Sequence, residues 1–502
     1  MTQTHFDVII VGAGLSGIGA AYHLQEKCPG KSYTILEGRD AIGGTWDLFR
    51  YPGIRSDSDM HTLGYIFKPW KERKAIADGP SILKYVRETA EENGIDQHIR
   101  YNHLVEQADW NSETAMWALT TRDATTGELR HLSCNFLYMC SGYYSYKGGY
   151  RPDFPGEENF EGQIVHPQHW PEDLDYKDRN VVVIGSGATS VTLVPEMAKK
   201  AKHVTMLQRS PTYIVSRPAE DSFANGLRKW LPEKWAYGIT RWRNILFQMF
   251  FFSKSRKDPD KVKGKIIDMA KDELGPGHDV DRHFTPSYNP WDQRLCLVPD
   301  GDLFQSLKDG TSSIVTDHIE RFTKTGIELK SGESLDADIV VSATGLELVF
   351  LGGVELTLDG RPVDVSTLHG YRGVMFEDLP NLVSTFGYTN ASWTLKADLT
   401  ADFVTKLLKH MEQGGHDSVV PKVEAPLADE PWLDFSSGYV KRAMDRFPKQ
   451  GDRTPWRLHQ NYIKDIFLLR HAKFDDGVLV FRKAERQPKT VASKPEASVA
   501  AE

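Results

Sequence analysis

Residues 6–17 read Phe-Asp-Val-Ile-Ile-Val-Gly-Ala-Gly-Leu-Ser-Gly, a short apolar run that passes directly into three closely spaced glycines. The β-branched residues of this run predict a buried parallel strand, and the next residues, Ile18–Gln25, are expected to form a helix. Gly12 permits a tight turn, Gly14 lets the backbone approach a pyrophosphate, and Gly17 allows helix and strand to pack closely. Because unpaired N–H groups at the start of such a helix bind phosphate, this stretch predicts a dinucleotide site.

An acidic residue follows at the distance that such a site requires. The run Ser32–Leu36 predicts a second strand, and Glu37 comes directly after it, about 20 residues or slightly more beyond the glycines. A carboxylate there accepts hydrogen bonds from ribose hydroxyls and repels a 2′-phosphate, which favours FAD or NAD over NADP. The alternative is a glycine-rich turn that arose by chance, but it does not account for strand, helix and acid together.

A second glycine-rich turn, Gly185-Ser186-Gly187-Ala188-Thr189-Ser190, repeats this pattern. It stands between an apolar run, Val181–Ile184, and a predicted helix, Ala188–Met197. Ser190 takes the place of the third glycine, and it is small enough for close packing, though less suited to it than glycine. The candidate nucleotide-binding residues of this turn are Gly185, Gly187, Thr189 and Ser190.

The strand after the second turn ends differently from the one before Glu37. Residues His203–Leu207 are followed by Gln208-Arg209-Ser210, with no acid. A guanidinium beside a hydroxyl can bind a 2′-phosphate, and arginine does so with two hydrogen bonds. Arg209 and Ser210 therefore predict NADPH as the second nucleotide, with a solvated surface charge as the alternative for Arg209. Two nucleotides held by one polypeptide imply electron transfer between them.

The composition is that of a large globular enzyme. At 502 residues, with 40% hydrophobic and 26% charged residues, the chain is too long for one core, and two or three domains are expected. The net charge of −8 argues against nucleic acid as a partner. No metal site is expected.

The cysteines indicate the redox compartment. Cys28, Cys134, Cys140 and Cys296 form no C-x-x-C pair, which excludes a dithiol flavoenzyme of the thioredoxin reductase type and suggests free thiols in a reducing compartment. Cys134 and Cys140 flank an apolar run and are interpreted as buried strand residues. Since the N-terminus passes straight into the first strand, no signal peptide is expected, and the predicted location is the cytoplasm.

The order of these motifs predicts an α/β fold with two Rossmann-like dinucleotide-binding domains and a helical insertion in the NADP domain. Two similar apolar runs, Phe136–Cys140 and Ile339–Ser342, are each followed by a small turn, which suggests that the chain leaves the first domain and later returns to it. The predicted segments are the FAD domain, first part (1–145), linkers (146–178), the NADP domain, first part (179–214), a helical insertion (215–285), the NADP domain, second part (286–345), the FAD domain, second part (346–486), and a disordered tail (487–502).

The predicted insertion contains an aromatic-rich stretch, Trp230–Phe252, which arginines and lysines interrupt and follow. It is too polar and too broken for a transmembrane span. Two interpretations remain. The stretch is a helical subdomain that packs its aromatics on the core, or part of it touches lipid at the membrane periphery or guides an apolar substrate inward.

Between the two glycine turns lies the motif Phe160-x-Gly162-x-x-x-His166-x-x-x-Trp170-Pro171. With Pro167 after the histidine, it resembles the signature of type I Baeyer–Villiger monooxygenases, which are class B flavoprotein monooxygenases. Three further stretches, residues 43–59, 289–299 and 387–398, are most similar to the ethionamide-activating monooxygenases of mycobacteria. The resemblance covers nearly the whole chain except the C-terminal tail.

The resemblance implies a reaction. NADPH reduces FAD, the reduced flavin forms a C4a peroxide with O₂, and this peroxide attacks a ketone to give a tetrahedral adduct and then an ester or lactone. Small hydrophobic ketones or sulfides are the implied substrates, and thioether oxidation is expected beside ketone oxidation. An N- or S-oxidising monooxygenase is the alternative, and a flavoprotein that only forms peroxide a distant one. The oligomeric state is left open.

The resemblance also implies site residues. Arg294 corresponds to the active-site arginine and Asp57 to the carboxylate that holds it; without the resemblance, a structural ion pair between domains would be favoured. His166 and Trp170 would couple domain rotation to cofactor handling. Gln293 stands where many members have a second 2′-phosphate-binding lysine, so NADPH preference rests more on Arg209. The remaining implied contacts, to the flavin, nicotinamide or substrate, are Gly43, Gly44, Thr45, Trp46, Asp47, Tyr51, Asn390 and Trp393.

Overall fold

A computed structural model describes residues 4–293 and 295–484 of the chain. Its largest sheet has nine strands in the order β18-β17-β4-β5-β6-β1-β2-β3, with β21 pairing with β6. Strands β3, β2, β1, β6 and β21 run parallel to one another, and β5 is antiparallel to β4 and β6. The bounds are β1 (His5–Val11), β2 (Tyr33–Leu36), β3 (Ile99–Arg100), β4 (Leu104–Asn111), β5 (Met116–Arg122), β6 (Leu129–Met139), β17 (Glu355–Leu358), β18 (Arg361–Pro362) and β21 (Leu382–Ser384).

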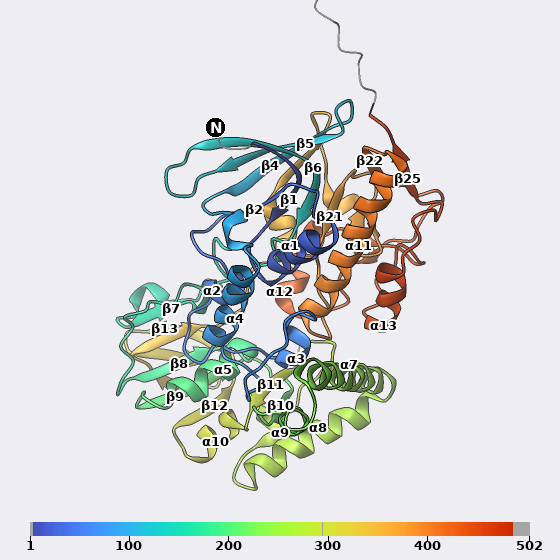
Figure 1. Ribbon diagram of the computed structural model, residues 1–502. Helices are drawn as coiled ribbons and strands as arrows, with labels where there is room; N and C mark the ends of the chain where they lie inside the picture. Colours follow the sequence, from blue (N-terminus) through green and yellow to red (C-terminus); the bar gives the residue numbers. More distant parts are fainter. Residues whose placement is uncertain (1–3, 294, 485–502) are drawn as a thin grey trace, which may run out of the picture.

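The second sheet is smaller and wholly parallel. Its five strands follow the order β12-β9-β8-β16-β7 and lie at the lower left of Figure 1, below the first sheet. They are β7 (Gln163–Val165), β8 (Asn180–Ile184), β9 (His203–Gln208), β12 (Ser312–Thr316) and β16 (Ile339–Ser342). A parallel sheet must be covered on both faces, and the strands β8 and β16 are almost entirely buried.

Two small sheets accompany the second one, and three accompany the first. Those beside the second sheet are β10 (Ile214–Arg217) with β11 (Cys296–Pro299), and β13 (Ile319–Thr323) with β14 (Gly326–Leu329) and β15 (Ser334–Asp336). Those beside the first sheet are β19 (Gly370–Tyr371) with β20 (Met375–Phe376), β22 (Ser418–Pro421) with β25 (Leu479–Arg482), and β23 (Glu430–Pro431) with β24 (Lys449–Gln450).

Helices from distant parts of the sequence meet on the first sheet. Helix α1 follows β1 and packs against α11, which lies more than 350 residues later in the chain, and Figure 1 shows the two side by side. The helices here are α1 (Leu15–Lys27), α2 (Thr45–Leu48), α3 (Met60–Leu63), α4 (Gly79–Glu92), α11 (Trp393–Gly414), α12 (Gly438–Lys441) and α13 (Tyr462–Asp465).

The helices that follow β10 bridge the two halves of the molecule. Tyr237 and Ile245 on α7 belong to the hydrophobic core of the first sheet, whereas Ala270 and Leu274 on α8 belong to that of the second. Helices of this lower part are α5 (Ala188–Met197), α6 (Ser222–Leu227), α7 (Glu233–Lys257), α8 (Pro259–Leu274), α9 (Val280–His283) and α10 (Asp302–Lys308).

The expected α/β class with two Rossmann-like halves is confirmed by the two sheets, in each of which a glycine turn joins a strand to a helix. The first of these helices begins at Leu15 rather than Ile18, because Gly14 already serves as its N-cap. Helix α11 ends at Gly414, where Gly415 adopts a φ of 60° and serves as its C-cap.

The aromatic stretch 230–252 is largely one helix, α7, which starts at Glu233 after Pro232. The interpretation that its aromatics pack on the core holds for Tyr237, which is buried, but Trp230, Trp235 and Phe250 are exposed. In the described residues, no helix is both long enough and apolar enough to cross a membrane. The predicted tail beyond residue 487 lies outside the described residues.

Candidate active site

The first glycine turn leaves no room for a side chain at Gly12 or at Gly17. Gly12 has a φ of 104°, and a Cβ there would lie 2.6 Å from the carbonyl oxygen of Cys140. A Cβ on Gly17 would lie 1.9 Å from the carbonyl oxygen of Gly12. Because neither position carries a side chain, the start of α1 packs closely against the end of β1. This is the close strand–helix packing expected of Gly17.

A second glycine pair faces this turn. Gly43 donates its N–H to the carbonyl oxygen of Ala13 at 3.0 Å, and a Cβ on Gly44 would lie 3.2 Å from the Cα of Gly14. Gly43 and Gly44 both have positive φ values, 119° and 55°, which residues with side chains rarely adopt. The result is a cradle of bare backbone between the two turns.

Glu37 is fastened to the same turn. One carboxylate oxygen accepts the N–H of Ala13 at 2.8 Å, and the other accepts the N–H of Arg39 at 3.0 Å. The side chain is buried, and this burial raises the pKa of the Glu37 carboxyl, against the opposing effect of the two N–H groups. Since each carboxylate oxygen has two acceptor positions, one on each remains for a ligand hydroxyl.

Asp47, a predicted flavin contact, is already surrounded by guanidinium groups. Its oxygens lie 2.8 Å from Nη2 of Arg39 and 3.3 Å from Nη2 of Arg87, and Arg50 is 3.6 Å away. The sequence pattern did not identify Arg39 or Arg87, although Arg39 stands only two residues beyond Glu37. Thr45 and Trp46 lie in the first turn of α2, directly after Gly44.

Trp393 links α11 to the first glycine turn. Its indole N–H donates to the hydroxyl of Ser16 at 2.7 Å, and its ring stacks on Tyr143 with centroids 5.1 Å apart. Asn390, three residues earlier, donates its side-chain amide to the carbonyl oxygen of Gln460 at 3.0 Å. Tyr143 was not predicted, and its place in a short turn after β6 offers little sequence signal.

In the second glycine turn, Gly185 leaves no space for a side chain, whereas Gly187 does. Gly185 has a φ of 136°, and a Cβ there would lie 2.4 Å from the carbonyl oxygen of Ala343. A Cβ on Gly187 would meet no atom within 4 Å. Ser190 is completely buried at the third position, so a serine fits where glycine is usual.

The predicted 2′-phosphate residues stand at the end of β9. Arg209 and Ser210 are exposed, and the backbone carbonyl of Ser210 accepts the hydroxyl hydrogen of Ser186 at 3.0 Å. This hydrogen bond holds the residues after β9 against the second glycine turn. Among the described residues, Arg209 has no ion-pair partner, so its guanidinium is available to a ligand.

Residues 51–53, which follow α2, connect the region of the first glycine turn to that of the second. Tyr51 lies beside Thr189 at the start of α5, and burial raises the pKa of Tyr51 to about 12. A Cβ on Gly53 would lie 2.9 Å from Cβ of Glu196 on α5. Residues 51–53 therefore lie directly on the helix that starts at the second glycine turn.

The chain passes from the first sheet to the second after β6 and returns after β16. The signature motif lies where these two connections meet. His166 Nε2 lies 3.3 Å from the carbonyl oxygen of Gly345, and its Nδ1 accepts the N–H of Gln168 at 3.2 Å. This pair of contacts requires the neutral ring with a proton on Nε2, and burial lowers the pKa of His166. Gln168 in turn donates to the carbonyl oxygen of Ser145 at 2.7 Å.

The other signature residues support this junction by packing. A Cβ on Gly162 would lie 2.4 Å from the carbonyl oxygen of Asp338, which explains the glycine. Phe160 meets Phe322 edge to face, and Trp170, just before Pro171, packs on the core of the second sheet.

Of the predicted catalytic pair, Asp57 is exposed and Arg294 lies outside the described residues. Arg55, two residues before Asp57, forms an ion pair with Asp302 at the start of α10. This pair is a further bridge between the two halves that the sequence did not indicate. The part of the chain that the structure describes holds no group of three His, Cys, Asp or Glu side chains suited to a metal.

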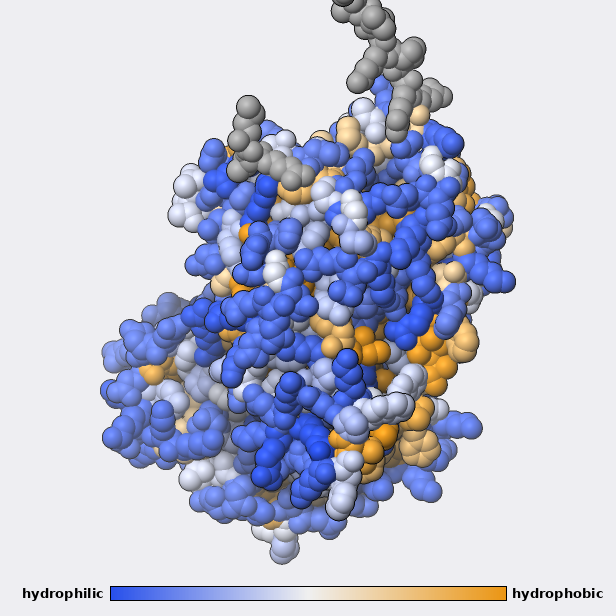
Figure 2. Space-filling model, in the orientation of Figure 1, coloured by the Kyte–Doolittle hydropathy of each residue, from blue (hydrophilic) through white to orange (hydrophobic). Residues whose placement is uncertain are grey.

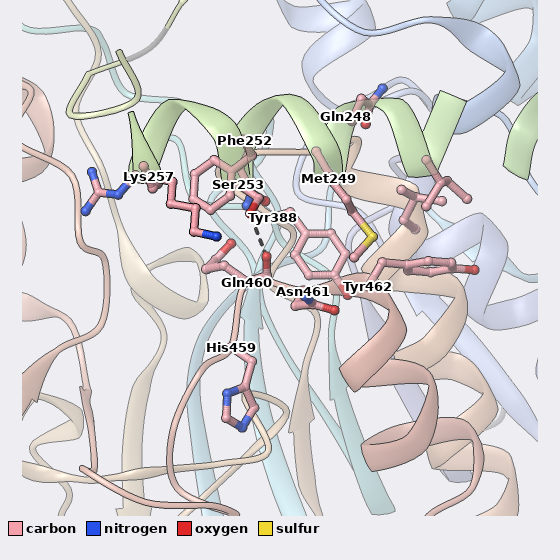
Figure 3. Close-up of a pocket in the computed structure, with 15 residues that line it drawn as sticks. Gln248, Met249, Phe252, Ser253, Lys257, Tyr388, His459, Gln460, Asn461 and Tyr462 are labelled. Carbon is pink, nitrogen blue, oxygen red and sulfur yellow. Dashed lines mark hydrogen bonds between the residues drawn. The ribbon is translucent and has the colours of Figure 1, made fainter. Parts of the chain in front are cut away.

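A cavity of about 410 Å³ lies between α7 and two distant segments of the first half. Figure 3 shows Met249 and Phe252 projecting from α7 toward Tyr388 and residues 460–462. Lys257 stands at the C-terminal end of the α7 wall. No sequence pattern predicted this cavity, because its walls are more than 130 residues apart in the chain.

Comparisons with known proteins agree with this geometry. Residues 10–71 match the model of the NAD(P)-binding Rossmann-like domain, and residues 73–266 match that of the flavin-binding monooxygenase-like family. The FAD-containing monooxygenase EthA of Mycobacterium tuberculosis is 56% identical over 96% of this chain and 99% of its own. The probable FAD-binding monooxygenase AlmA of Acinetobacter baylyi is 50% identical over 96% of this chain and 97% of its own.

The fold agrees as well. A solved structure described as oxidized steroid monooxygenase bound to NADP has a TM-score of 0.75 and 21% identity, covering 96% of this chain and all of that one. The expected resemblance to flavin monooxygenases is thereby confirmed. The chain belongs to the family of FAD-containing monooxygenases.

Proposed function

We propose that the protein uses NADPH and O₂ to convert hydrophobic ketones to esters or lactones, with oxidation of thioethers as a second activity. The observation that carries this proposal is the pair of bare-backbone glycine turns, at Gly14 and Gly187, joined through Tyr51 and Thr189. Two dinucleotides bound at these turns would lie on either side of one connecting segment. The steroid monooxygenase bound to NADP, which shares the fold, supports NADP as the second ligand.

The residues present fit FAD at the first turn. The cradle between Gly14 and Gly44, which a Cβ would fill, admits the pyrophosphate and the flavin end of the nucleotide. Glu37 would accept the ribose hydroxyls through the acceptor positions that Ala13 and Arg39 leave open. Bound FAD would supply the redox chemistry that activates O₂. The further contacts that we assign to FAD are Gly12, Gly17, Thr45, Trp46 and Tyr51.

At the second turn the fit is to NADPH. Gly187 leaves room for a phosphate beside the start of α5, and exposed Arg209 with Ser210 would hold the 2′-phosphate. Thr189 and Ser190 complete the turn after Gly185, and Trp393 would border the nicotinamide.

Asp47 would act on the flavin through its neighbours. Arg39 and Arg87 occupy its two oxygens, so the carboxylate fixes those guanidinium groups beside the cradle. We therefore assign it a positioning role, with direct flavin contact left to the α2 backbone and Thr45.

For the chemical step we propose Arg294, oriented by Asp57, on the resemblance to the family. An arginine suits a site in which oxyanions develop on the substrate, because it is always cationic and offers several rigid donors. Replacing Arg294 with Ala should leave the yellow FAD bound and abolish ester formation. Wild-type ester yield from that variant would refute the role.

We assign the signature residues Phe160, Gly162, His166, Trp170 and Pro171 to the coupling of the two halves. His166 ties the first connection to Gly345 on the second, so rotation of one sheet against the other would have to move this contact. A neutral, doubly hydrogen-bonded histidine is suited to holding a junction rather than to transferring protons.

We also propose the segment boundaries expected from the sequence, with FAD held by 1–145 and 346–486 and NADP by 179–214 and 286–345. Pairing of β21 with β6, and of β16 with β8, supports this division. The protein would work in the cytoplasm, with residues of the 215–285 insertion touching a membrane at its periphery.

Product analysis tests the function. Purified protein with NADPH, O₂ and a panel of aliphatic ketones, cyclic ketones and aryl sulfides should yield esters or lactones, and sulfoxides from the sulfides. Amine or sulfide oxidation without any ester would favour an N- or S-oxidising enzyme. NADPH consumption that yields only hydrogen peroxide with every compound would contradict an oxygenating role.

A further inference from the structure

Helix α7 exposes an apolar stripe to solvent. Trp235, Ile239, Trp242, Leu246 and Phe250 follow one another at intervals of three or four residues, which places them on one face of the helix. Trp235 is 69% exposed, Leu246 51% and Phe250 68%. Trp230, in the turn before the helix, is 87% exposed.

The opposite face of α7 is held by buried contacts, so the helix cannot rotate to bury the stripe. Arg241 is buried and pairs with Asp398 on α11 at 3.3 Å. It also donates to the carbonyl oxygens of His61 and Gly64 at 2.8 and 2.7 Å. Breaking a buried pair of this kind is strongly unfavourable, so the orientation of the stripe is set by the fold.

The apolar surface extends beyond α7. Figure 2 shows hydrophobic side chains gathered over α7 and around α13 at the lower right of the molecule. Phe467, just after α13, is 65% exposed, and Trp242 contacts Tyr462 at the start of α13 with ring centroids 5.9 Å apart. Contiguous exposed apolar surface of this kind marks a binding face.

The charge around the stripe indicates what covers it. Apart from buried Arg241, residues 228–265 contain ten Lys or Arg and three Asp or Glu, although the whole chain has a net charge of −8. Lys234 beside Trp235 and Lys257 at the end of α7 have no ion-pair partner in the described part of the chain. Exposed tryptophans with flanking cations are suited to the interface of an anionic bilayer.

The cavity of about 410 Å³ lies beside this surface. Ile245, Met249 and Phe252 line it from α7, and the stripe residues Leu246 and Phe250 lie between them in sequence. Tyr462 also lines the cavity and contacts Trp242 of the stripe. The cavity therefore borders the α7 stripe.

We propose that the α7 stripe rests on the surface of an anionic phospholipid bilayer and that the adjoining cavity receives the apolar part of a substrate from that bilayer. This inference rests on the proposed function for the identity of the substrate, whereas lipid binding itself requires no catalysis.

Vesicle co-sedimentation tests the docking surface. The FAD-loaded protein should sediment with vesicles of phosphatidylcholine and phosphatidylglycerol, less with phosphatidylcholine alone, and less at high salt. The double variant Leu246→Ser/Phe250→Ser should bind roughly tenfold more weakly, because two side chains no longer enter the interface. Neither residue lines the cavity, so oxidation of a water-soluble ketone should be unchanged.

The matched control is Leu104→Ser/Leu129→Ser, which replaces two exposed leucines on β4 and β6 of the first sheet. It should bind vesicles as the wild type does. Equal binding by wild type and both variants, or no binding to anionic vesicles, would overturn the docking surface. A stripe that serves only self-association would also overturn it. In that case the wild type would form dimers and bind no vesicles, and the stripe variant would lose the dimers.

A third variant tests the cavity separately. Ala391→Phe narrows it, and we expect vesicle binding to persist while extraction of a vesicle-borne long-chain methyl ketone by the protein falls about tenfold. Extraction is measured as ketone recovered with protein after the vesicles are removed, without NADPH. Unchanged extraction would overturn the role of the cavity, and loss of product formation with normal extraction would instead count against the proposed reaction.

Discussion

The carboxylate of Glu37 accepts the backbone N–H of Ala13 at 2.8 Å, inside the first glycine turn. The acid at the end of β2 is therefore anchored to the same backbone that forms the cradle between Gly14 and Gly44. Ligand-binding groups that are held in place before the ligand arrives lose less entropy on binding.

Replacing Glu37 with Gln should weaken FAD retention about tenfold, because a hydrogen bond to a charged acceptor contributes roughly 1.5–3 kcal/mol. Glutamine turns one oxygen into an NH₂ group, so one acceptor for ribose is lost. The FAD-to-protein ratio after dilution and filtration measures the effect. Glu113→Gln, at an exposed position far from the turn, is the control. Full FAD retention by Glu37→Gln would refute the ribose contact.

Two glycines of the second turn should respond differently to alanine. Gly185→Ala should lower thermal stability, because its Cβ would lie 2.4 Å from the carbonyl oxygen of Ala343 and its φ is 136°. Gly187→Ala meets no protein atom within 4 Å, so it should fold normally and raise the KM for NADPH. Melting curves and steady-state kinetics of both variants separate the effects. A normal KM in Gly187→Ala would argue against phosphate binding there.

Arg209→Ala should weaken NADPH binding by tenfold or more while leaving NADH nearly unchanged, since a charge-assisted pair with a 2′-phosphate is worth about 1.5–3 kcal/mol. Lys202→Ala, an exposed cation at the other end of β9, should alter neither. Michaelis constants for both nucleotides test this. If they are unchanged in Arg209→Ala, the 2′-phosphate site lies elsewhere.

His166 should make the junction between the sheets sensitive to acid. Burial lowers the pKa of His166 below its ordinary value of 6.5, so its contribution to stability is complete above about pH 6.5 and is lost as the pH falls through the lower value of the folded state. Protonation would also remove the acceptor for the Gln168 N–H.

Melting temperatures of wild type and His166→Gln between about pH 7.5 and pH 5 measure this contribution. The difference between the two should shrink as the medium becomes acidic. His169→Gln, at an exposed neighbouring position, should show a constant difference. A difference for His166→Gln that does not change with pH would contradict a buried neutral histidine.

The sequence predicted the parts of the fold that local patterns determine. Strands before the glycine turns and the helix Ala188–Met197 were located to within a few residues, because apolar runs and glycines are local signals. The acid at Glu37 and the cation at Arg209 were found for the same reason, since each follows a strand at a set distance.

Features that depend on distant segments were missed. Asp47 is held by Arg39 and Arg87, and the latter lies on a helix that no motif connects to the glycine turns. The cavity joins α7 to Tyr388 and residues 459–462, which only the three-dimensional fold brings together. The aromatic stretch was recognised, but its exposure depends on which face Arg241 fixes against α11.

We expect this chain to insert an oxygen atom from O₂ into organic substrates at the expense of NADPH. The most direct test supplies ¹⁸O₂, NADPH and a hydrophobic ketone to the FAD-loaded protein and measures the ester by mass spectrometry. We predict one ¹⁸O atom per ester and one ester per NADPH consumed. NADPH consumption that ends entirely in hydrogen peroxide, with no labelled ester from any ketone and no labelled sulfoxide from any sulfide, would contradict a monooxygenase activity.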